Sequence, residues 1–540
     1  MKLDEKALKD KTAWEAGGFI LPAFDREQVR EETEKRPEWV HFGCGNLFRA
    51  FPAVLCQRLL DQGDMKTGII VAEGYDYEIV ENAVRPQDNL CLAVTLKPDV
   101  TIGKRVVASV VESLTADSQN PADFGRLKEI FRNRSLRMAS FTITEKGYGL
   151  ANGRGELLPD VQADFAAGPS APKSYMGKVA ALCYERYLNG RLPLALVSMD
   201  NCSHNGTRLY EAVSAFARAW TENGLAEEGF EAYIRSDAVS FPWTMIDKIT
   251  PRPDESVKKM LADAGFEDVE PVVTSKNTYV APFVNAEEPE YLVIEDVFPN
   301  GRPPLEKAGV MFADRETVDK VEKMKVCTCL NPLHTALAVF GCLLGYTRIY
   351  EEMKDPQLKK LVELVGYQEG LPVVTDPGII RPVDFLKEVL EVRMPNPFMP
   401  DAPQRIACDT SQKLAVRFGK TINAYQDRAD LSTDDLKMIP LVLAGWCRYL
   451  MGIDDEGKAF QLSPDPMLPE VCPIVQKIRL GDQGPFDEAL RPLLSNRKIF
   501  GVDLYAGGLA GCVAGYFREL AAGPGAVRNT LKKYVGEPET

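Results

Sequence analysis

Short runs of β-branched and other apolar residues alternate with helical segments through the first 310 residues. The runs are WVHFG, GIIVAEG, VVASVVESL, RMASFTITEKG, LPLALVSMDN and PEYLVIEDVF. Strands that alternate with helices predict a mostly parallel sheet with helices on both faces. From about Val318 onward, segments of 3.6-residue period replace this pattern. We therefore expect an α/β domain over residues 1–310 and a mostly α-helical domain over residues 311–540, with the turn-forming segment Pro299–Pro304 close to the junction.

Composition narrows the class of protein. A chain of 540 residues with 45% hydrophobic content can bury at least two cores. Its net charge of −14 repels phosphate backbones and anionic membranes, so we expect neither a nucleic-acid nor a membrane partner. The 12 cysteines form no disulfide framework, and the charged N-terminus lacks the apolar stretch of a signal peptide. No apolar run approaches the roughly 20 residues that a membrane span needs, and the sequence predicts a cytoplasmic protein.

A glycine-bearing turn follows the first apolar run, in the segment WVHFGCGNLFRA. Gly43 permits a tight turn, and Gly45 lets a pyrophosphate approach the backbone at a helix N-terminus. Phe48 occupies the position of the third glycine in the usual dinucleotide-binding pattern. A Rossmann-like dinucleotide-binding domain is one interpretation, and an ordinary strand-to-helix turn is the other.

Two carboxylates follow the next predicted strand. Glu73 ends that strand and Asp76 lies just beyond it. A carboxylate at this place binds the ribose hydroxyls of NAD and repels the 2′-phosphate of NADP, so NAD is the expected cofactor. The alternative is that both are solvated loop carboxylates.

Seven segments, taken in order along the chain, then resemble one family. They are HFGCGNLFRA, FTITEKGYGL, VSMDN, FPWTMIDKITP, EDVFPNGRPPLEKAGVMF, EKMKVCTCLNPLHTAL and NPFMPDAPQRIACDTSQKLAVRF. In these segments the chain resembles the polyol-specific long-chain dehydrogenases, which include mannitol 2-dehydrogenase, fructuronate reductase and tagaturonate reductase. The resemblance covers most of the chain and implies an NAD-dependent oxidoreductase with a Rossmann-like N-terminal domain.

The resemblance also implies roles for individual residues. Lys325 is the implied general base of a zinc-independent mechanism, with Glu322 on the proton route. Asn331 and His334 are implied to hydrogen-bond the reacting oxygen. Asn201 and Asp247 are implied to line the substrate site. Arg405 and Lys413 are implied to contact distal groups of the substrate. The residues implied to contact the cofactor are Gly43, Gly45, Asn46, Phe48, Arg49, Glu73, Asp76, Thr144 and Glu145.

Hydride transfer from a secondary alcohol needs a base and hydrogen-bond donors for the developing alkoxide, and these residue types supply both. Lys325 on its own also fits a surface lysine that covers a helix, and His334 also fits a satisfied core histidine. Asn331 and Pro332 fit the N-cap and first position of a helix.

The spacing from Lys325 to Asn331 is one residue longer than the family pattern. In a continuous α-helix, the nine residues from Lys325 to His334 would separate them by roughly 180° around the axis and about 13–14 Å along it. We therefore expect the helix to start at Asn331, or a π-bulge to absorb the extra residue. Lys323 is the alternative base.

Three further features remain open. Trp243 stands where the family pattern has asparagine, and we expect it to change the substrate pocket. Cys327 and Cys329 have no matching Cys/His pair nearby, so no metal site is expected. Charged residues recur every four positions, which indicates either an ion-pair ladder on one helical face or a site for a sugar-acid carboxylate. These residues are Arg405, Asp409, Lys413 and Arg417.

The function implied by the resemblance is interconversion of a ketose or keto-uronate and the corresponding polyol or aldonate. The reduction of D-fructuronate by NADH to D-mannonate is the first expectation, and mannitol 2-dehydrogenase or tagaturonate reductase activity is the second. A non-catalytic sugar- or nucleotide-binding homologue is the alternative from another class. The sequence makes no prediction of oligomeric state.

Overall fold

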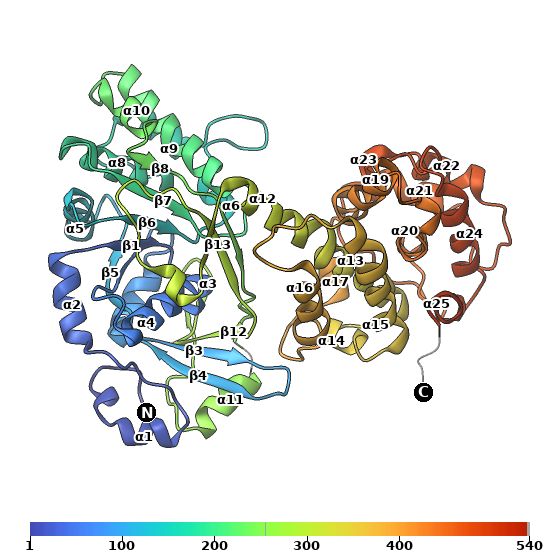
Figure 1. Cartoon of the computed structure of the whole chain (residues 1–540), viewed down its shortest axis with the longest axis horizontal. Helices are drawn as coiled ribbons and strands as arrows, with labels where there is room; N and C mark the ends of the chain where they lie inside the picture. Colours follow the sequence, from blue (N-terminus) through green and yellow to red (C-terminus); the bar gives the residue numbers. More distant parts are fainter. Residues whose placement is uncertain (254, 537–540) are drawn as a thin grey trace. The chain divides into compact units, whose positions relative to one another are not determined.

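The computed structural model describes residues 1–253 and 255–536. These residues form two compact units. The first unit holds residues 1–97 and 101–319, and the second holds residues 98–100 and the chain from Lys320 onward. The predicted architecture, an α/β Rossmann-like N-terminal part and a helical C-terminal part, is confirmed (Figure 1).

The first unit is built on a parallel sheet of six strands in the order β5-β2-β1-β6-β7-β8. The strands are β1 (Trp39–Phe42), β2 (Ile69–Glu73), β5 (Val110–Thr115), β6 (Met138–Phe141), β7 (Leu194–Ser198) and β8 (Val239–Ser240). Strand order reverses beside β1, which is the point where doubly wound folds bind ligands at the carboxyl ends of the strands.

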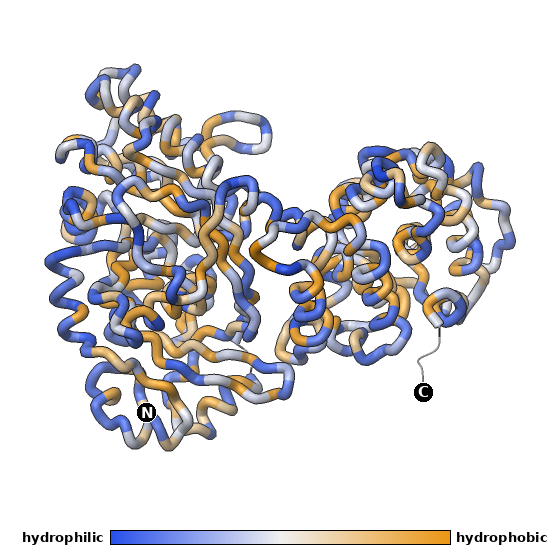
Figure 2. The backbone as a smooth tube through the Cα atoms, in the orientation of Figure 1, coloured by the Kyte–Doolittle hydropathy of each residue, from blue (hydrophilic) through white to orange (hydrophobic). Residues whose placement is uncertain are grey.

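Both faces of this sheet are buried. In β2, Ile69 and Val71 pack into a cluster with residues of α4 (Pro52–Gln62), while Ile70 and Ala72 pack into a second cluster. The second cluster draws on α5 (Pro121–Arg132), α8 (Tyr175–Leu188) and α9 (Asn205–Glu222). Side chains alternate across a strand, so a run of consecutive apolar residues fits a sheet covered on both sides. In Figure 2 the interior strands are largely apolar, whereas the outer helix α2 (Arg26–Lys35), at the left edge, is largely polar.

Two predicted strands differ from the observed ones. The run VVASVVESL contributes to two strands, β4 (Ile102–Val107) and β5, which belong to different sheets. The run PEYLVIEDVF forms β13 (Tyr291–Glu295), which lies outside the main sheet and pairs antiparallel with β9 (Thr244–Asp247). The remaining strands are β3 (Cys91–Leu96), β10 (Val272–Val273), β11 (Tyr279–Val280), β12 (Phe283–Glu287) and β14 (Met311–Ala313).

The other helices of the first unit are short. They are α1 (Lys11–Ala16), α3 (Asn46–Ala50), α6 (Glu145–Tyr148), α7 (Pro159–Ala167), α10 (Gly229–Ile234) and α11 (Glu255–Asp263). Among them, α3 and α6 directly follow β1 and β6, so they lie at the carboxyl ends of the strands, where this fold binds its ligands.

The second unit is helical throughout its described length. Its two most buried helices, α13 (Asn331–Leu344) and α20 (Met438–Tyr449), pack against each other at its centre. Its other helices are α14 (Ile349–Glu352), α15 (Pro356–Glu363), α16 (Pro382–Glu388), α17 (Pro403–Ile406), α18 (Thr410–Leu414), α19 (Lys420–Asp427), α21 (Leu468–Val475), α22 (Asp487–Leu494), α23 (Arg497–Phe500), α24 (Ala510–Leu520) and α25 (Ala526–Val535).

One helical run, from Arg315 to Leu344, is long and apolar enough to cross a membrane, a property that the sequence reading did not identify. It comprises α12 (Arg315–Met324), a π-helical segment and α13. Most of its apolar stretch, 78%, is buried inside the protein, as in the core helix of a folded domain. Length and composition here are therefore weak evidence for a membrane span.

Candidate active site

The glycine turn after β1 has the geometry that its sequence predicts. Gly43 has a φ of 109°, and a Cβ atom there would lie 2.5 Å from the carbonyl oxygen of Thr142. Only glycine fits this position. Gly45 has a φ of −74°, and a Cβ atom there would meet nothing within 4 Å. The backbone at Gly45 therefore faces open space, as the approach of a pyrophosphate requires.

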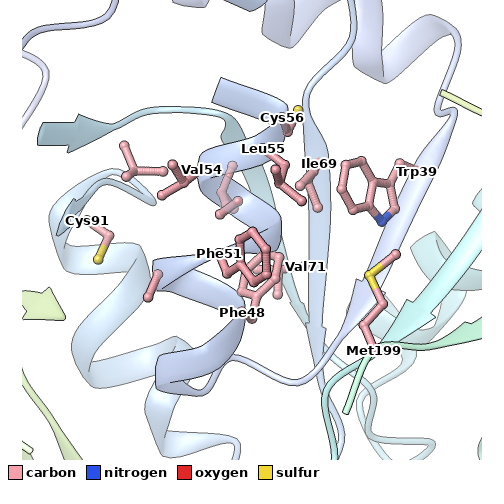
Figure 3. Packing of buried hydrophobic residues seen from close by; sticks show 14 of the residues in the cluster. Trp39, Phe48, Phe51, Val54, Leu55, Cys56, Ile69, Val71, Cys91 and Met199 are labelled. Atoms are coloured by element: carbon pink, nitrogen blue, oxygen red, sulfur yellow. The ribbon is translucent and has the colours of Figure 1, made fainter. Parts of the chain in front are cut away.

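The helix that follows the turn is broken. It is divided into α3 and α4 at Phe51, and Pro52 is the first residue of α4. Phe48, at the position of the missing third glycine, is 1% exposed and stacks on His41 with ring centroids 4.1 Å apart. Figure 3 shows Phe48 and Phe51 among the buried residues that face β2. The ring of Phe48 thus supports the turn from inside the core.

Glu73 points into the protein at the end of β2. Its Oε2 accepts the N–H of Cys44 at 2.9 Å, and its Oε1 accepts the N–H of Tyr75 at 2.8 Å. Asp76 is also buried, and its carboxylate accepts the hydroxyl of Thr274 at 2.7 Å. The alternative of two solvated loop carboxylates is therefore wrong. Glu73 ties the glycine turn to β2, because one of its bonds goes to the residue between the two glycines.

A cavity of about 550 Å³ lies beside this turn in the first unit. It brings together five of the predicted residues, which are Gly45, Asn46, Arg49, Thr144 and Asn201. Other parts of its wall come from Asp200, Cys202, Thr250 and the hairpin residues Thr278, Tyr279 and Val280. The cavity therefore joins the ends of β1, β6 and β7, where a doubly wound sheet holds the nicotinamide half of a dinucleotide.

Arg49 supplies a buried positive charge to the cavity wall. Its Nη1 donates to the carbonyl oxygen of Ala281 at 2.6 Å, and its Nη2 donates to Oδ1 of Asn46 at 2.8 Å. Its Nε is buried and has no hydrogen-bond partner among the described residues. Arg49 also lines the cavity, so its charge favours an anionic ligand there.

Other predicted residues of the first unit do not line this cavity. Glu145 is exposed and pairs with Arg208 at 2.7 Å. Asp247 is buried at the end of β9. Trp243 stacks on His204 with ring centroids 4.2 Å apart and donates to Thr207.

A larger hollow of about 630 Å³ lies at the β8 edge of the main sheet, three strands from β1. It holds none of the predicted residues, and its wall includes Tyr210, Arg235 and Arg315. It is remote in the sheet from the glycine turn, so the smaller cavity is the better candidate for a dinucleotide site.

A buried polar network, which the sequence did not predict, lies next to the cavity. The hydroxyl of Tyr148 donates to the carboxylate of Asp200 and lies 2.9 Å from Oγ of Ser198. Burial raises the pKa of Asp200. Asp200 also accepts the N–H of Cys202 at 3.0 Å, which fixes the backbone on both sides of Asn201. Tyr148 and Asp200 both lie in segments that carry the family resemblance, and this was the only signal for them.

The second unit holds the predicted catalytic residues. Lys325 is the first residue of a π-helical segment, Lys325–Cys329, and α13 starts at Asn331. Leu330 leaves the helical conformation between them, with a φ of −130°. Both expected ways of absorbing the extra residue therefore occur together. The separation calculated for a continuous α-helix does not apply to Lys325 and His334.

Asn331 is not the N-cap that the sequence predicted. Leu330 occupies that position, Asn331 is the first residue of α13 and Pro332 the second. The side chain of Asn331 makes no capping bond, because the preceding π-helical segment already brings the chain into the helix. The amide of Asn331 is therefore not committed to the helix end.

His334 lies in the first turn of α13 and is half-buried. Burial lowers its pKa to about 4; Asp401 opposes this shift, while Arg393, Arg417 and Arg405 add to it. The imidazole is therefore neutral at physiological pH and can donate one hydrogen bond without carrying a charge. Lys325 and Glu322 are half-buried, whereas the alternative base, Lys323, is exposed.

The ladder predicted over Arg405, Asp409, Lys413 and Arg417 does not form. Asp409 has a φ of 53° and interrupts the helix between α17 and α18. Arg405 pairs with Asp401, and Lys413 donates to the carbonyl oxygens of Ile406 and Cys408. One continuous helical face is therefore absent, and each cation has its own surroundings.

The cysteines of the π-helical segment have no metal-binding partners in the described part of the chain. Cys329 is buried, and burial raises the pKa of its thiol to about 12. Within residues 1–253 and 255–536, no group of three or more histidine, cysteine or acidic side chains is arranged to hold a metal ion.

Known proteins resemble the chain over its whole length. The Mannitol dehydrogenase Rossmann domain matches residues 37–307, and the Mannitol dehydrogenase C-terminal domain matches residues 317–514. The D-mannonate oxidoreductase of Thermotoga maritima is 54% identical over 541 aligned positions, which cover 100% of both chains. The mannitol 2-dehydrogenase of Neosartorya fischeri is 31% identical over 519 positions, which cover 93% of each chain.

Solved structures agree with these matches. The Pseudomonas fluorescens mannitol 2-dehydrogenase in ternary complex with NAD and D-mannitol has a TM-score of 0.68 at 27% identity, over 100% of both chains. A D-sorbitol dehydrogenase shares the fold, with a TM-score of 0.77 at 24% identity over 95% of this chain and 97% of that one. The resemblance predicted from the sequence is confirmed, and the chain belongs to the mannitol dehydrogenase family.

Proposed function

We propose that the protein is an NAD-dependent oxidoreductase that converts D-fructuronate, NADH and a proton to D-mannonate and NAD. The observation that carries this proposal is the 54% identity to a D-mannonate oxidoreductase over the full length of both chains. The mannitol dehydrogenases among the relatives share only 30–32% of their residues with this chain. A keto-uronate is therefore a better supported substrate than a neutral ketose.

The first unit supplies the cofactor site in this proposal. When bound, NADH supplies the hydride to the carbonyl carbon. The open backbone at Gly45 and the positive charge of Arg49 fit the pyrophosphate, while Thr144 and Asn201 line the other part of the cavity. Gly43, Phe48 and Glu73 shape the turn, with Asn46 holding Arg49 in place. We also assign Asp76 and Glu145 to the neighbourhood of the cofactor on the strength of the resemblance.

The second unit supplies the proton chemistry. Lys325 donates a proton to the carbonyl oxygen during reduction and removes it during oxidation. Asn331 and the neutral His334 donate hydrogen bonds to the same oxygen and stabilise the negative charge that develops there. Glu322 exchanges the proton of the lysine with solvent. Of the two candidate lysines, Lys325 is the half-buried one, as a base protected from water requires.

Four further residues bind the polar groups of the substrate in this proposal: Asn201, Asp247, Arg405 and Lys413. The site uses no metal ion. We also propose a cytoplasmic location and neither a nucleic-acid nor a membrane partner, in keeping with the net charge of −14.

A second candidate is mannitol 2-dehydrogenase activity, because the fold matches an enzyme of that name in complex with NAD and D-mannitol. Tagaturonate reductase activity is the remaining candidate within the family. A non-catalytic homologue loses its main support, since the longer spacing after Lys325 is absorbed by the π-helical segment without disrupting α13.

The substrate assignment is tested by following NADH absorbance with purified protein and D-fructuronate, D-tagaturonate or D-fructose, with the product identified by mass spectrometry. We expect fast oxidation of NADH with D-fructuronate and formation of D-mannonate. Turnover confined to D-tagaturonate or D-fructose would contradict the assignment. NADH binding without turnover of any of the three would support the non-catalytic alternative instead.

A further inference from the structure

Arg417 lies against the helix turn that carries the catalytic residues of the second unit. It belongs to a π-helical segment, Ala415–Gly419, which packs against both α13 and the segment Lys325–Cys329. Its Nη1 donates to Oγ1 of Thr335 at 2.6 Å, and this hydroxyl donates to the carbonyl oxygen of Asn331 at 3.0 Å. The guanidinium group is therefore fixed beside the first turn of α13, next to His334.

The hydrogen-bonding capacity of Arg417 is mostly unused. A guanidinium group has five N–H donors, and Thr335 is the only acceptor that Arg417 has among the described residues. Two fully buried arginines of the chain make more hydrogen bonds than Arg417 does. Arg186 donates to five backbone carbonyl groups, and Arg448 donates to three.

No carboxylate among the described residues forms an ion pair with Arg417, and burial alone lowers its pKa to about 10. Three arginines, Arg417, Arg393 and Arg405, lower the pKa of His334, while Asp401 raises it. Arg417 also contributes to the lowered pKa of Lys413, after burial. A half-buried cation without a counter-ion is stabilised by binding an anion.

The two cations that the sequence reading assigned to distal substrate groups are engaged elsewhere. Arg405 is exposed and pairs with Asp401, four residues earlier in the chain. Lys413 donates to two backbone carbonyl groups. Arg417 is the remaining cation of the predicted series, and among the described residues it has neither an ion-pair partner nor a backbone acceptor.

We propose that Arg417 binds the carboxylate of the substrate and thereby makes the site selective for sugar acids over neutral sugars. This inference rests on the proposed function, because it needs a substrate of the keto-uronate class. The planar fork of the guanidinium group matches a carboxylate with two parallel hydrogen bonds. The bond to Thr335 holds the fork at a fixed place relative to His334, so the carboxylate end sets the position of the reacting carbon.

The test compares D-mannonate with D-mannitol, which differ only in that CH₂OH replaces the carboxylate at one end. Initial rates of NAD reduction are measured for the wild type, Arg417→Gln and Arg417→Lys. In Arg417→Gln, we expect kcat/KM for D-mannonate to fall by about 30- to 1000-fold, the loss of one or two charge-assisted hydrogen bonds. The value for D-mannitol should change by less than about threefold, since no such bonds are lost. Arg417→Lys keeps the charge without the fork and should give an intermediate loss.

Two controls separate a local effect from a general one. Lys420→Gln removes the same charge from an exposed side chain three residues further along, and both substrates should be unaffected. Titration of D-mannonate into protein saturated with NADH measures binding without turnover, and Arg417→Gln should weaken this binding while NADH affinity stays unchanged. If Arg417→Gln does not fold, the same measurements on Arg417→Lys carry the test.

The outcomes distinguish the inference from the proposed function. If the wild type does not oxidise D-mannonate, the proposed function fails, and the inference fails with it. If the wild type oxidises D-mannonate and the Arg417 variants retain both its affinity and its preference over D-mannitol, the inference alone is overturned.

Discussion

Substitution by alanine should have opposite effects at Gly43 and Gly45, the two glycines that follow β1. In Gly43→Ala, a φ of 109° costs a side chain about 1–3 kcal/mol. The new Cβ would also lie 2.5 Å from the oxygen of Thr142, whose own N–H is bonded to Phe42, so the sheet must shift at a further cost of about 1–3 kcal/mol. We expect the first unit to lose about 2–6 kcal/mol of stability.

Gly45→Ala should leave stability almost unchanged, because its φ is −74° and a Cβ atom meets nothing within 4 Å. The methyl group instead fills the space that a pyrophosphate would occupy. Loss of one charge-assisted hydrogen bond to the backbone, about 1.5–3 kcal/mol, weakens NADH binding by roughly 10- to 100-fold.

Scanning calorimetry of the cofactor-free protein measures the first effect, and titration of NADH fluorescence measures the second. Each variant is the control for the other. A Gly45→Ala protein that binds NADH like the wild type would refute the placement of the pyrophosphate at this turn. A Gly43→Ala protein of normal stability would refute the argument from strain.

Three further predictions concern buried groups. Tyr148→Phe removes the hydroxyl that donates to Asp200, so we expect urea unfolding to show that the free energy of unfolding falls by about 1–3 kcal/mol. We also expect kcat/KM to fall, and unchanged kinetics would show that this network does not support the site. Burial raises the pKa of Glu352, whose oxygens have no hydrogen-bond partner among the described residues, so the folded protein loses stability as pH rises above about 4.5. Glu352→Gln should therefore raise the melting temperature more at pH 8 than at pH 5, and an equal change at both pH values would contradict this. The pKa of His334 is lowered to about 4, so the unfolded chain binds more protons than the folded one between about pH 6.5 and pH 4, and stability falls as pH falls through this range. His334→Asn should remove about 2 kcal/mol of the stability difference between pH 7 and pH 5. An identical pH dependence in the wild type and the variant would refute the low pKa.

Local sequence pattern was enough to predict the parallel sheet and the glycine turn. Both depend on short-range rules, since consecutive apolar residues indicate a strand buried on both faces and Gly43 has a steric requirement of its own. The break within VVASVVESL could not be predicted in this way. It depends on α4, where Gln57 accepts the N–H of Ala108 and the carbonyl group of Ala53 accepts the hydroxyl of Ser109.

The candidate site shows the same limit. The family resemblance implied Lys325, Asn331 and His334 as site residues, and the spacing correctly indicated an irregular helix between them. The partners of charged side chains could not be read from the sequence. Glu73 bonds to a residue 29 positions away, and Arg417 bonds to one 82 positions away, so their roles depend on tertiary contacts.

The most direct test of the proposed metal-independent catalysis by Lys325 is the rate of NADH oxidation with D-fructuronate. The rate is measured for the wild type, Lys325→Ala and Lys323→Ala, each preloaded with NADH in the presence of a metal chelator. We expect the wild type and Lys323→Ala to turn over at similar rates. Lys325→Ala should bind NADH normally but turn over at least about a hundredfold more slowly, since this is the usual contribution of a general acid or base. Full activity of Lys325→Ala, or loss of wild-type activity on chelation, would contradict the proposal.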